Sequence, residues 1–152
     1  MSAGGTHEGL GIGDWALVRE WRVGGIRSHR DLLVWQKAMD LAVELYRATA
    51  AFPDHERFGL VSQLRRAAVS VPSNIAEGYG RGSTSDYIRF LRMSRGSLSE
   101  IDTQLLLCVS LDFLASDLHE RLIERVNECG RILAALIRSL EAKLATGDGA
   151  VN

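Results

Sequence analysis

QLRRAAVSVPSNIAEGYGR, residues 63–81, decides the fold because its helical pattern continues on both sides of a proline. The apolar residues from position 60 onward recur at steps of three or four, the spacing of one buried helix face: Leu60, Leu64, Ala68, Val71, Ile75 and Tyr79. A proline inside a helix removes one backbone hydrogen bond and crowds the carbonyl four residues earlier, which costs about 3 kcal/mol. The unbroken phase around Pro72 therefore predicts one kinked helix, in which Ser70, Ser73 and Asn74 satisfy the freed backbone groups.

The segment before this helix predicts a first helix with an unusually wide apolar surface. It is expected to begin near Leu33, with Asp31 as its cap, and to end at Phe52-Pro53, because the residue before a proline avoids helical geometry. Trp35 fits the core better than an assembly contact. Apolar residues nevertheless extend around much of this helix, and packing within one protomer needs fewer of them. The surplus predicts a second buried interface, and hence oligomerisation.

Two more helices follow the central one. The central helix is expected to run from Glu56 to Gly78 or Tyr79, where glycines supply a stop and a turn. Ser83 is expected to cap the third helix and Ser116 the fourth. The inward positions of these helices again follow steps of three and four: Tyr87, Leu91, Ser94, Leu98, Ile101, Leu105 and Cys108 in the third, and Leu122, Val126, Cys129, Leu133, Leu136 and Leu140 in the fourth.

No strand pattern competes, so the sequence predicts an all-α protein, an antiparallel up-down four-helix bundle over residues 31–145. Residues 1–30 are Gly-rich and aperiodic, and they are expected to form a flexible extension; residues 146–152 are expected to be a disordered tail. No apolar run approaches the roughly 18 residues of a membrane span. With no secretory signal visible, and with Cys108 and Cys129 placed as reduced core thiols, we expect a cytoplasmic protein.

Three segments resemble one particular family: DLLVWQKAMDLA at 31–42, FPDHERFGLVSQLRRAAVSVPSNIAEGYGRGS at 52–83 and FLRMSRGSLSEID at 90–102. This four-helix-bundle family includes proteins encoded within intervening sequences of bacterial 23S rRNA genes. It also includes the accessory variability determinants of diversity-generating retroelements. The resemblance implies a four-helix protomer, a homopentameric ring, and an RNA- or reverse-transcriptase-linked role without known enzymatic activity.

The arginines are the candidate nucleic-acid-binding residues. Between residues 54 and 95 the chain has seven arginines against four acids, whereas the rest of the chain after residue 95 is net acidic. Guanidinium groups pair bidentately with phosphates, and six arginines are singled out on that ground: Arg65, Arg66, Arg81, Arg89, Arg92 and Arg95. The alternative is a solvated surface with local ion pairs, such as Glu77 with Arg81. The net charge of −1 argues against a strongly basic RNA-binding domain.

The residues near Pro72 are predicted to be structural. Asn74 is expected to bond backbone loosened by the proline, and Glu77 to pair with Arg81 or with a neighbouring subunit. Gly96 lies inside the predicted third helix, where glycine is costly, and close approach of another helix is the expected reason.

No motif supports catalysis. The four histidines do not cluster, and the HxxH, CxxC, HExxH, P-loop and GxSxG patterns are absent, so neither a metal nor another cofactor is expected. No small-molecule substrate is evident. Two functions remain open. One is a non-enzymatic homo-oligomeric scaffold that binds structured RNA or a nucleoprotein partner; the other is a protein-binding adaptor, for example of a reverse transcriptase.

Overall fold

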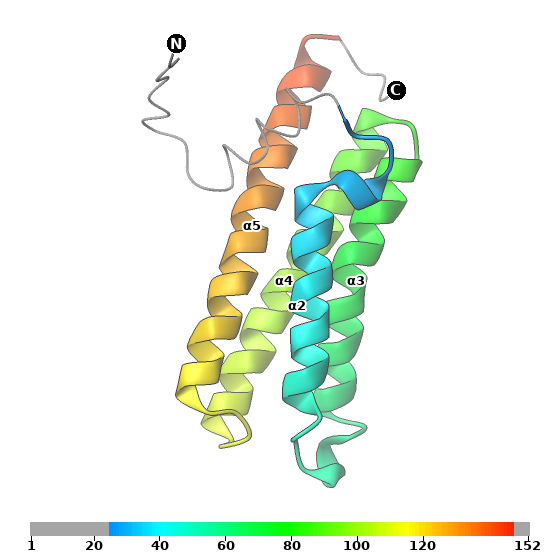
Figure 1. Ribbon diagram of the computed structural model, residues 1–152. Coiled ribbons are helices and arrows are strands. Elements are labelled where there is room, and N and C mark those ends of the chain that lie inside the picture. The colour runs from blue at the N-terminus through cyan, green and yellow to red at the C-terminus, as the bar shows by residue number, and fades with distance from the viewer. Residues whose placement is uncertain (1–24, 148–152) are drawn as a thin grey trace, which may run out of the picture.

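Four long helices form the protein in the computed structural model, which describes residues 25–147. They are α2 (Leu33–Thr49), α3 (Leu60–Gly80), α4 (Thr84–Ser110) and α5 (Ser116–Ala145). Two short 3₁₀ turns, η1 (His29–Asp31) and η2 (Asp54–Glu56), precede α2 and α3. Successive helices run in opposite directions, and α5 closes the bundle by packing against α2 (Figure 1). The predicted all-α antiparallel four-helix bundle is confirmed.

The predicted inward positions form one continuous core. In α4 and α5 every residue of the two predicted stripes is buried, and in α3 only Tyr79 is not fully so. Leu64, Ile75, Leu91, Ile101 and Leu133 are all at most 1% exposed. Helical spacing alone therefore assigned the buried faces of these three helices correctly.

The predicted kinked helix is one continuous element, with Pro72 buried inside α3. The Ser94 hydroxyl of α4 donates to the Val71 carbonyl at 2.8 Å, next to the proline. The Asn74 side chain donates to the Ser70 carbonyl, also at 2.8 Å. The carbonyl that a proline at position 72 leaves without its helical partner is that of Ala68, four residues back. Asn74 and Ser94 thus bond the Ser70 and Val71 carbonyls, next to the freed one. The predicted backbone partner for Ser70 is wrong, because its hydroxyl pairs with the Ser97 hydroxyl of α4.

The first helix begins at Leu33 as predicted, but two predicted caps and one predicted helix start are wrong, each for a local reason. Asp31 does not cap α2, because its carboxylate accepts from the backbone of Arg27 and Ser28 and closes η1. These bonds lower the pKa of Asp31 below its ordinary value. The central helix begins at Leu60 instead of Glu56, because η2 intervenes. The helix α5 begins at Ser116 itself, after an Ala115 N-cap.

The Ser83 cap is confirmed, since its hydroxyl accepts from the backbone N–H of Asp86 at 3.3 Å.

The predicted end of the first helix is wrong, because α2 ends at Thr49, before Phe52-Pro53. Trp35, predicted to be a core residue, packs against the core but is only partly buried.

Two glycine predictions are also wrong. Gly96 faces open space, with nothing within 4 Å of an added Cβ, so close helix approach does not explain it. Gly78 is not a stop but a buried residue inside α3, where a Cβ would lie 2.7 Å from the Cβ of Phe90. Gly82, with φ +75°, is the residue that makes the turn between α3 and α4.

The predicted termini lie partly outside the described residues. Within the expected extension, Ile26 packs against the core, and the Arg30 carbonyl accepts from the Gln36 side chain at 2.8 Å. Residues 1–24 and 148–152, and with them most of the two predicted terminal segments, are outside the described part of the chain.

Candidate nucleic-acid interface

Two of the six candidate arginines meet at the corner between α3 and α4. The Arg81 and Arg89 guanidinium carbons lie 5.1 and 4.7 Å from the centre of the Phe90 ring. Phe90 is 8% exposed, and its Cβ would lie 2.7 Å from a Cβ added at Gly78 of α3. Because Gly78 has no side chain, Phe90 can lie close to α3, and both guanidinium groups pack on its ring.

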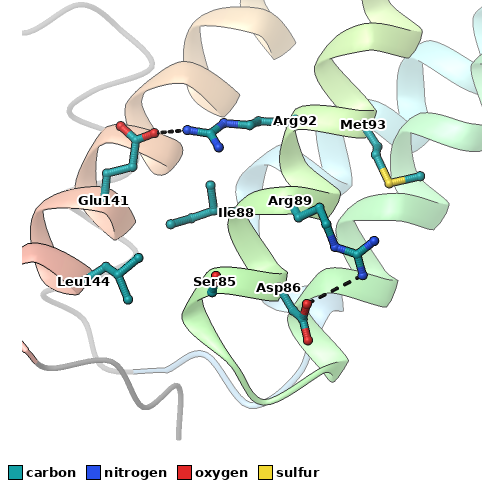
Figure 2. A pocket seen from close by; sticks show the side chains of 8 residues that line it. All are labelled: Ser85, Asp86, Ile88, Arg89, Arg92, Met93, Glu141 and Leu144. Carbon is teal, nitrogen blue, oxygen red and sulfur yellow. Dashed lines mark hydrogen bonds and ion pairs between the residues drawn. The ribbon is translucent and has the colours of Figure 1, made fainter.

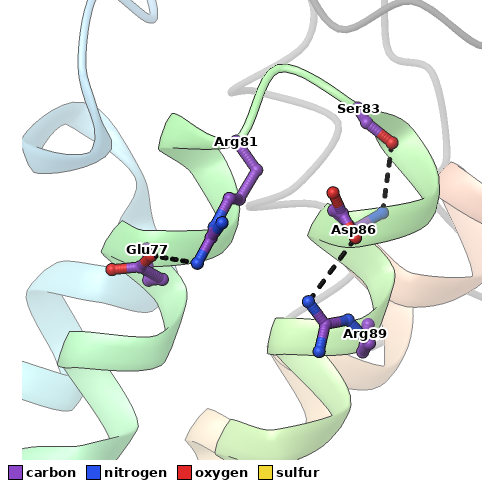
Figure 3. Close-up of polar contacts among 5 residues, drawn as sticks. All are labelled: Glu77, Arg81, Ser83, Asp86 and Arg89. Atoms are coloured by element: carbon purple, nitrogen blue, oxygen red, sulfur yellow. Dashed lines mark hydrogen bonds and ion pairs between the residues drawn. The ribbon is translucent and has the colours of Figure 1, made fainter.

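Carboxylates accompany both of these arginines (Figure 3). Arg81 pairs with Glu77 one turn earlier at 2.7 Å, and Arg89 pairs with Asp86 at 3.6 Å. All four side chains are about half exposed, and ion pairs at such positions contribute little to stability. A phosphate could therefore compete for either arginine, but it would meet a partly neutralised charge.

Arg92 points to the other side of α4. Its guanidinium pairs with Glu141 of α5 beside a hollow that Ile88 and Leu144 help to line, whereas Arg89 points away from α5 (Figure 2). The two arginines are three residues apart on one helix, yet they face different neighbours.

Arg65 is engaged at the end of α2. Its Nε donates to the Thr49 hydroxyl at 3.0 Å, and its Nη2 donates to the Tyr46 carbonyl at 3.2 Å. The guanidinium also lies over the Tyr46 ring, 4.6 Å from its centre. Arg65 therefore ties the last turn of α2 to α3, and this contact fully accounts for its position.

Arg66 and Arg95 have no ion pair with any residue in the described range 25–147. Arg66 is exposed on α3, and Arg95 lies in a hollow between α4 and α5 together with Arg131. The six arginines thus do not form one surface. Arg81 and Arg89 lie together, Arg92 and Arg95 face α5, and Arg65 faces α2.

The sequence did not predict two residues that shape these sites: Gly78, at the close contact of α3 with α4, and Arg131, beside Arg95. Gly78 stands two residues before Gly80, and a run of glycines reads as a turn when the extent of the helix is unknown. Arg131 lies in the net acidic part of the chain after residue 95, so a search for regions rich in arginine does not single it out. Antiparallel pairing of the last two helices places Arg131 opposite the middle of α4, and this register could have indicated that it lies near Arg95.

The two cysteines are free thiols in the core. Burial raises the pKa of Cys108 to about 11 and that of Cys129 to about 12. The thiolate is the reactive form, so both thiols are unreactive at neutral pH. Within residues 25–147, no three His, Cys, Asp or Glu side chains are grouped so that they could hold a metal ion.

One apolar stripe of α2 is exposed. Met39, Val43 and Tyr46 lie three or four residues apart and are 39–43% exposed. The opposite flank of α2 carries the ion pairs with α5, Lys37–Glu128 at 3.1 Å and Glu44–Arg125 at 2.7 Å. None of the described helices has the length and apolar character needed to cross a membrane.

Comparisons with known proteins find a matching family and a solved structure of similar fold. The model of the 23S rRNA-intervening sequence proteins matches residues 30–135. A crystal structure of a protein of unknown function from the S23 ribosomal protein family of Bacteroides thetaiotaomicron is similar in fold, with a TM-score of 0.63 and 21% identity. The similarity covers 69% of this chain and 98% of that one. No curated protein matches the sequence, and neither of these descriptions names an enzyme.

Proposed function

This chain belongs to the family of 23S rRNA-intervening sequence proteins, and from that premise we propose that it is a non-enzymatic, homo-oligomeric scaffold that binds structured RNA or a nucleoprotein partner. One observation carries the RNA part of the proposal. Arg81 and Arg89 lie together on the Phe90 ring at the corner between α3 and α4, and both side chains are about half exposed. Guanidinium groups placed together in this way can contact phosphates, and their surface ion pairs are weak enough to exchange.

The exposed stripe of α2 supports the oligomeric part. A second copy that covered Met39, Val43 and Tyr46 would bury apolar surface that the protomer leaves in water. A homopentameric ring, which the resemblance to the family implies, would repeat this contact around a closed cycle.

The test measures RNA affinity as a function of salt. Arg66, Arg89 and Arg92 are changed together to Glu, and the matched control changes Arg30, Arg47 and Arg121, which are exposed elsewhere and give the same net charge. We expect the first variant to bind structured RNA more weakly and with a smaller salt slope than the control. Equal affinities and slopes for the two variants would remove these arginines from the interface. Absence of RNA binding by the unchanged protein would reject the function itself.

The same apolar stripe also favours the second candidate, a protein-binding adaptor, for example of a reverse transcriptase in a diversity-generating retroelement. Exposed apolar residues on one helix face are common at protein interfaces. A tagged pull-down from the native host, with and without ribonuclease, separates the two candidates. A protein partner retained after ribonuclease treatment favours the adaptor, whereas one enriched RNA that survives moderate salt favours the scaffold.

A further inference from the structure

Two basic side chains, one from α4 and one from α5, line a hollow between these helices. This α4–α5 groove has a volume of about 440 Å³. Buried Leu98 and Val126 form its floor, and its remaining lining is polar or small: Arg95, Ser99, Asp102, Asn127, Gly130, Arg131 and Ala134. The groove is thus open at the surface, apolar at its base and edged by hydrogen-bonding groups.

Arg95 and Arg131 approach the groove from facing helices. Neither forms an ion pair with any residue between positions 25 and 147. The other hollow at this interface differs, because its Arg89 and Arg92 each have a carboxylate partner, Asp86 and Glu141. Of the two hollows, the α4–α5 groove is therefore the one that offers guanidinium groups without competing carboxylate bonds.

The wall of the groove is kept low by small residues. Gly130 lies in the middle of α5, where glycine weakens a helix relative to alanine. An added Cβ at Gly130 would meet nothing within 4 Å, so packing inside the protomer does not require this glycine. Space is left where a group outside the protomer could approach the α5 backbone between Arg131 and Asn127.

We infer that the α4–α5 groove binds a phosphate group of an RNA strand, clamped between Arg95 and Arg131. Planar guanidinium groups from two sides suit a tetrahedral oxyanion, and the Asn127 amide and Ser99 hydroxyl can donate to its remaining oxygens. The inference rests on the proposed RNA-binding function and adds a defined phosphate site to it. Asp102 lines the same groove and opposes an anion there, so its charge limits the affinity.

The test compares variants in binding fluorescein-labelled single-stranded RNA across a salt series, and then in binding inorganic phosphate by NMR of the Asn127 side-chain amide. The double variant Arg95→Gln and Arg131→Gln is expected to lose affinity roughly tenfold and to lower the salt slope by about 0.7, the value of one phosphate contact. The matched control, Arg47→Gln with Arg121→Gln, keeps the same net charge and is expected to retain the slope.

Two further variants separate a binding site from a structural role. Asp102→Asn is expected to tighten RNA binding, a gain that misfolding cannot produce. Gly130→Leu fills the groove and is expected to weaken binding, whereas Gly96→Leu, at an open helix position that does not line the groove, is expected to leave it unchanged. Circular dichroism confirms that each variant is folded.

The outcomes distinguish the site from the function. Unchanged RNA binding by the Arg95 and Arg131 variant overturns the groove and leaves the proposed function standing. If the unchanged protein binds neither this strand nor a structured RNA, the proposed function fails, and the phosphate titration then decides about the site. Shifts of the Asn127 amide that need both arginines would support a phosphate site, and absence of a shift would reject it. Tighter, arginine-dependent binding of an acidic peptide overturns the assignment to RNA.

Discussion

Gly78 of α3 and Phe90 of α4 are so close that a Cβ at position 78 would lie 2.7 Å from the Phe90 Cβ. Real Cβ atoms essentially never approach so closely, so a side chain at 78 would force α3 and α4 apart at their corner. Because Arg81 and Arg89 both pack on the Phe90 ring, the contact between Gly78 and Phe90 also determines the positions of these two guanidinium groups.

Gly78→Ala is accordingly expected to destabilise the protein by about 1–3 kcal/mol, the usual effect of overpacking a tight core. Gly80→Ala is the matched control, since a Cβ there meets nothing within 4 Å. Urea denaturation measures the midpoint of unfolding for each variant. Equal midpoints for the two alanine variants would show that the corner relaxes freely and would contradict the tight contact.

Sequence periodicity predicted which faces are buried but not how closely two helices approach. The apolar steps through Leu64, Val71 and Ile75 repeat over many turns, so the buried face of α3 was determined even with Pro72 among them. Contact at a single turn depends on the register between helices, which periodicity does not determine. For this reason the sequence predicts a stop at Gly78 and a helix contact at Gly96, and both predictions are wrong. Residues from α4 and α5 meet in the groove only through that register.

The hydrogen bond from Ser94 to the Val71 carbonyl is buried and spans two helices. Ser94→Ala leaves this carbonyl without its α4 donor, and we expect a loss of about 1–2 kcal/mol of unfolding free energy. Ser99→Ala serves as the control, because the Ser99 hydroxyl is exposed and bonds only its own helix, at the Arg95 carbonyl. Denaturant unfolding of both variants compares the two losses. A neutral Ser94→Ala would mean that the carbonyl finds another donor.

Arg65 is expected to affect stability more than RNA affinity. Arg65→Lys keeps the charge but cannot reproduce both bonds to α2 and the stacking on Tyr46, so a loss of about 1–2 kcal/mol is expected. Arg66→Lys, at the exposed neighbouring position, should be nearly neutral in stability. Thermal unfolding and RNA binding are measured on both variants. Reduced RNA affinity in a fully stable Arg65→Lys protein would reverse this assignment.

The buried thiols predict a loss of stability in alkali. Their raised pKa values mean that the folded protein keeps protons that the unfolded chain loses above pH 9, so the free energy of unfolding falls as pH rises toward 11–12. The slope approaches about 1.4 kcal/mol per pH unit for each thiol. Urea unfolding between pH 8 and about 11 is compared with the variant that carries Cys108→Ala and Cys129→Ala. Identical pH dependence in the two proteins would exclude the thiols as the cause.

The α2 stripe is the contact surface of the proposed homo-oligomer. Met39→Glu with Val43→Glu places two charges on the exposed apolar stripe while leaving Tyr46 to support Arg65, and we expect the oligomer to dissociate. Leu106→Glu is the control, because Leu106 is 59% exposed on α4 and lies outside the stripe. Sedimentation velocity at several concentrations measures the assembly state. If the α2 variant sediments like the unchanged oligomer, the stripe is not its interface; if the unchanged protein sediments as a single chain, the stripe is free for a different partner.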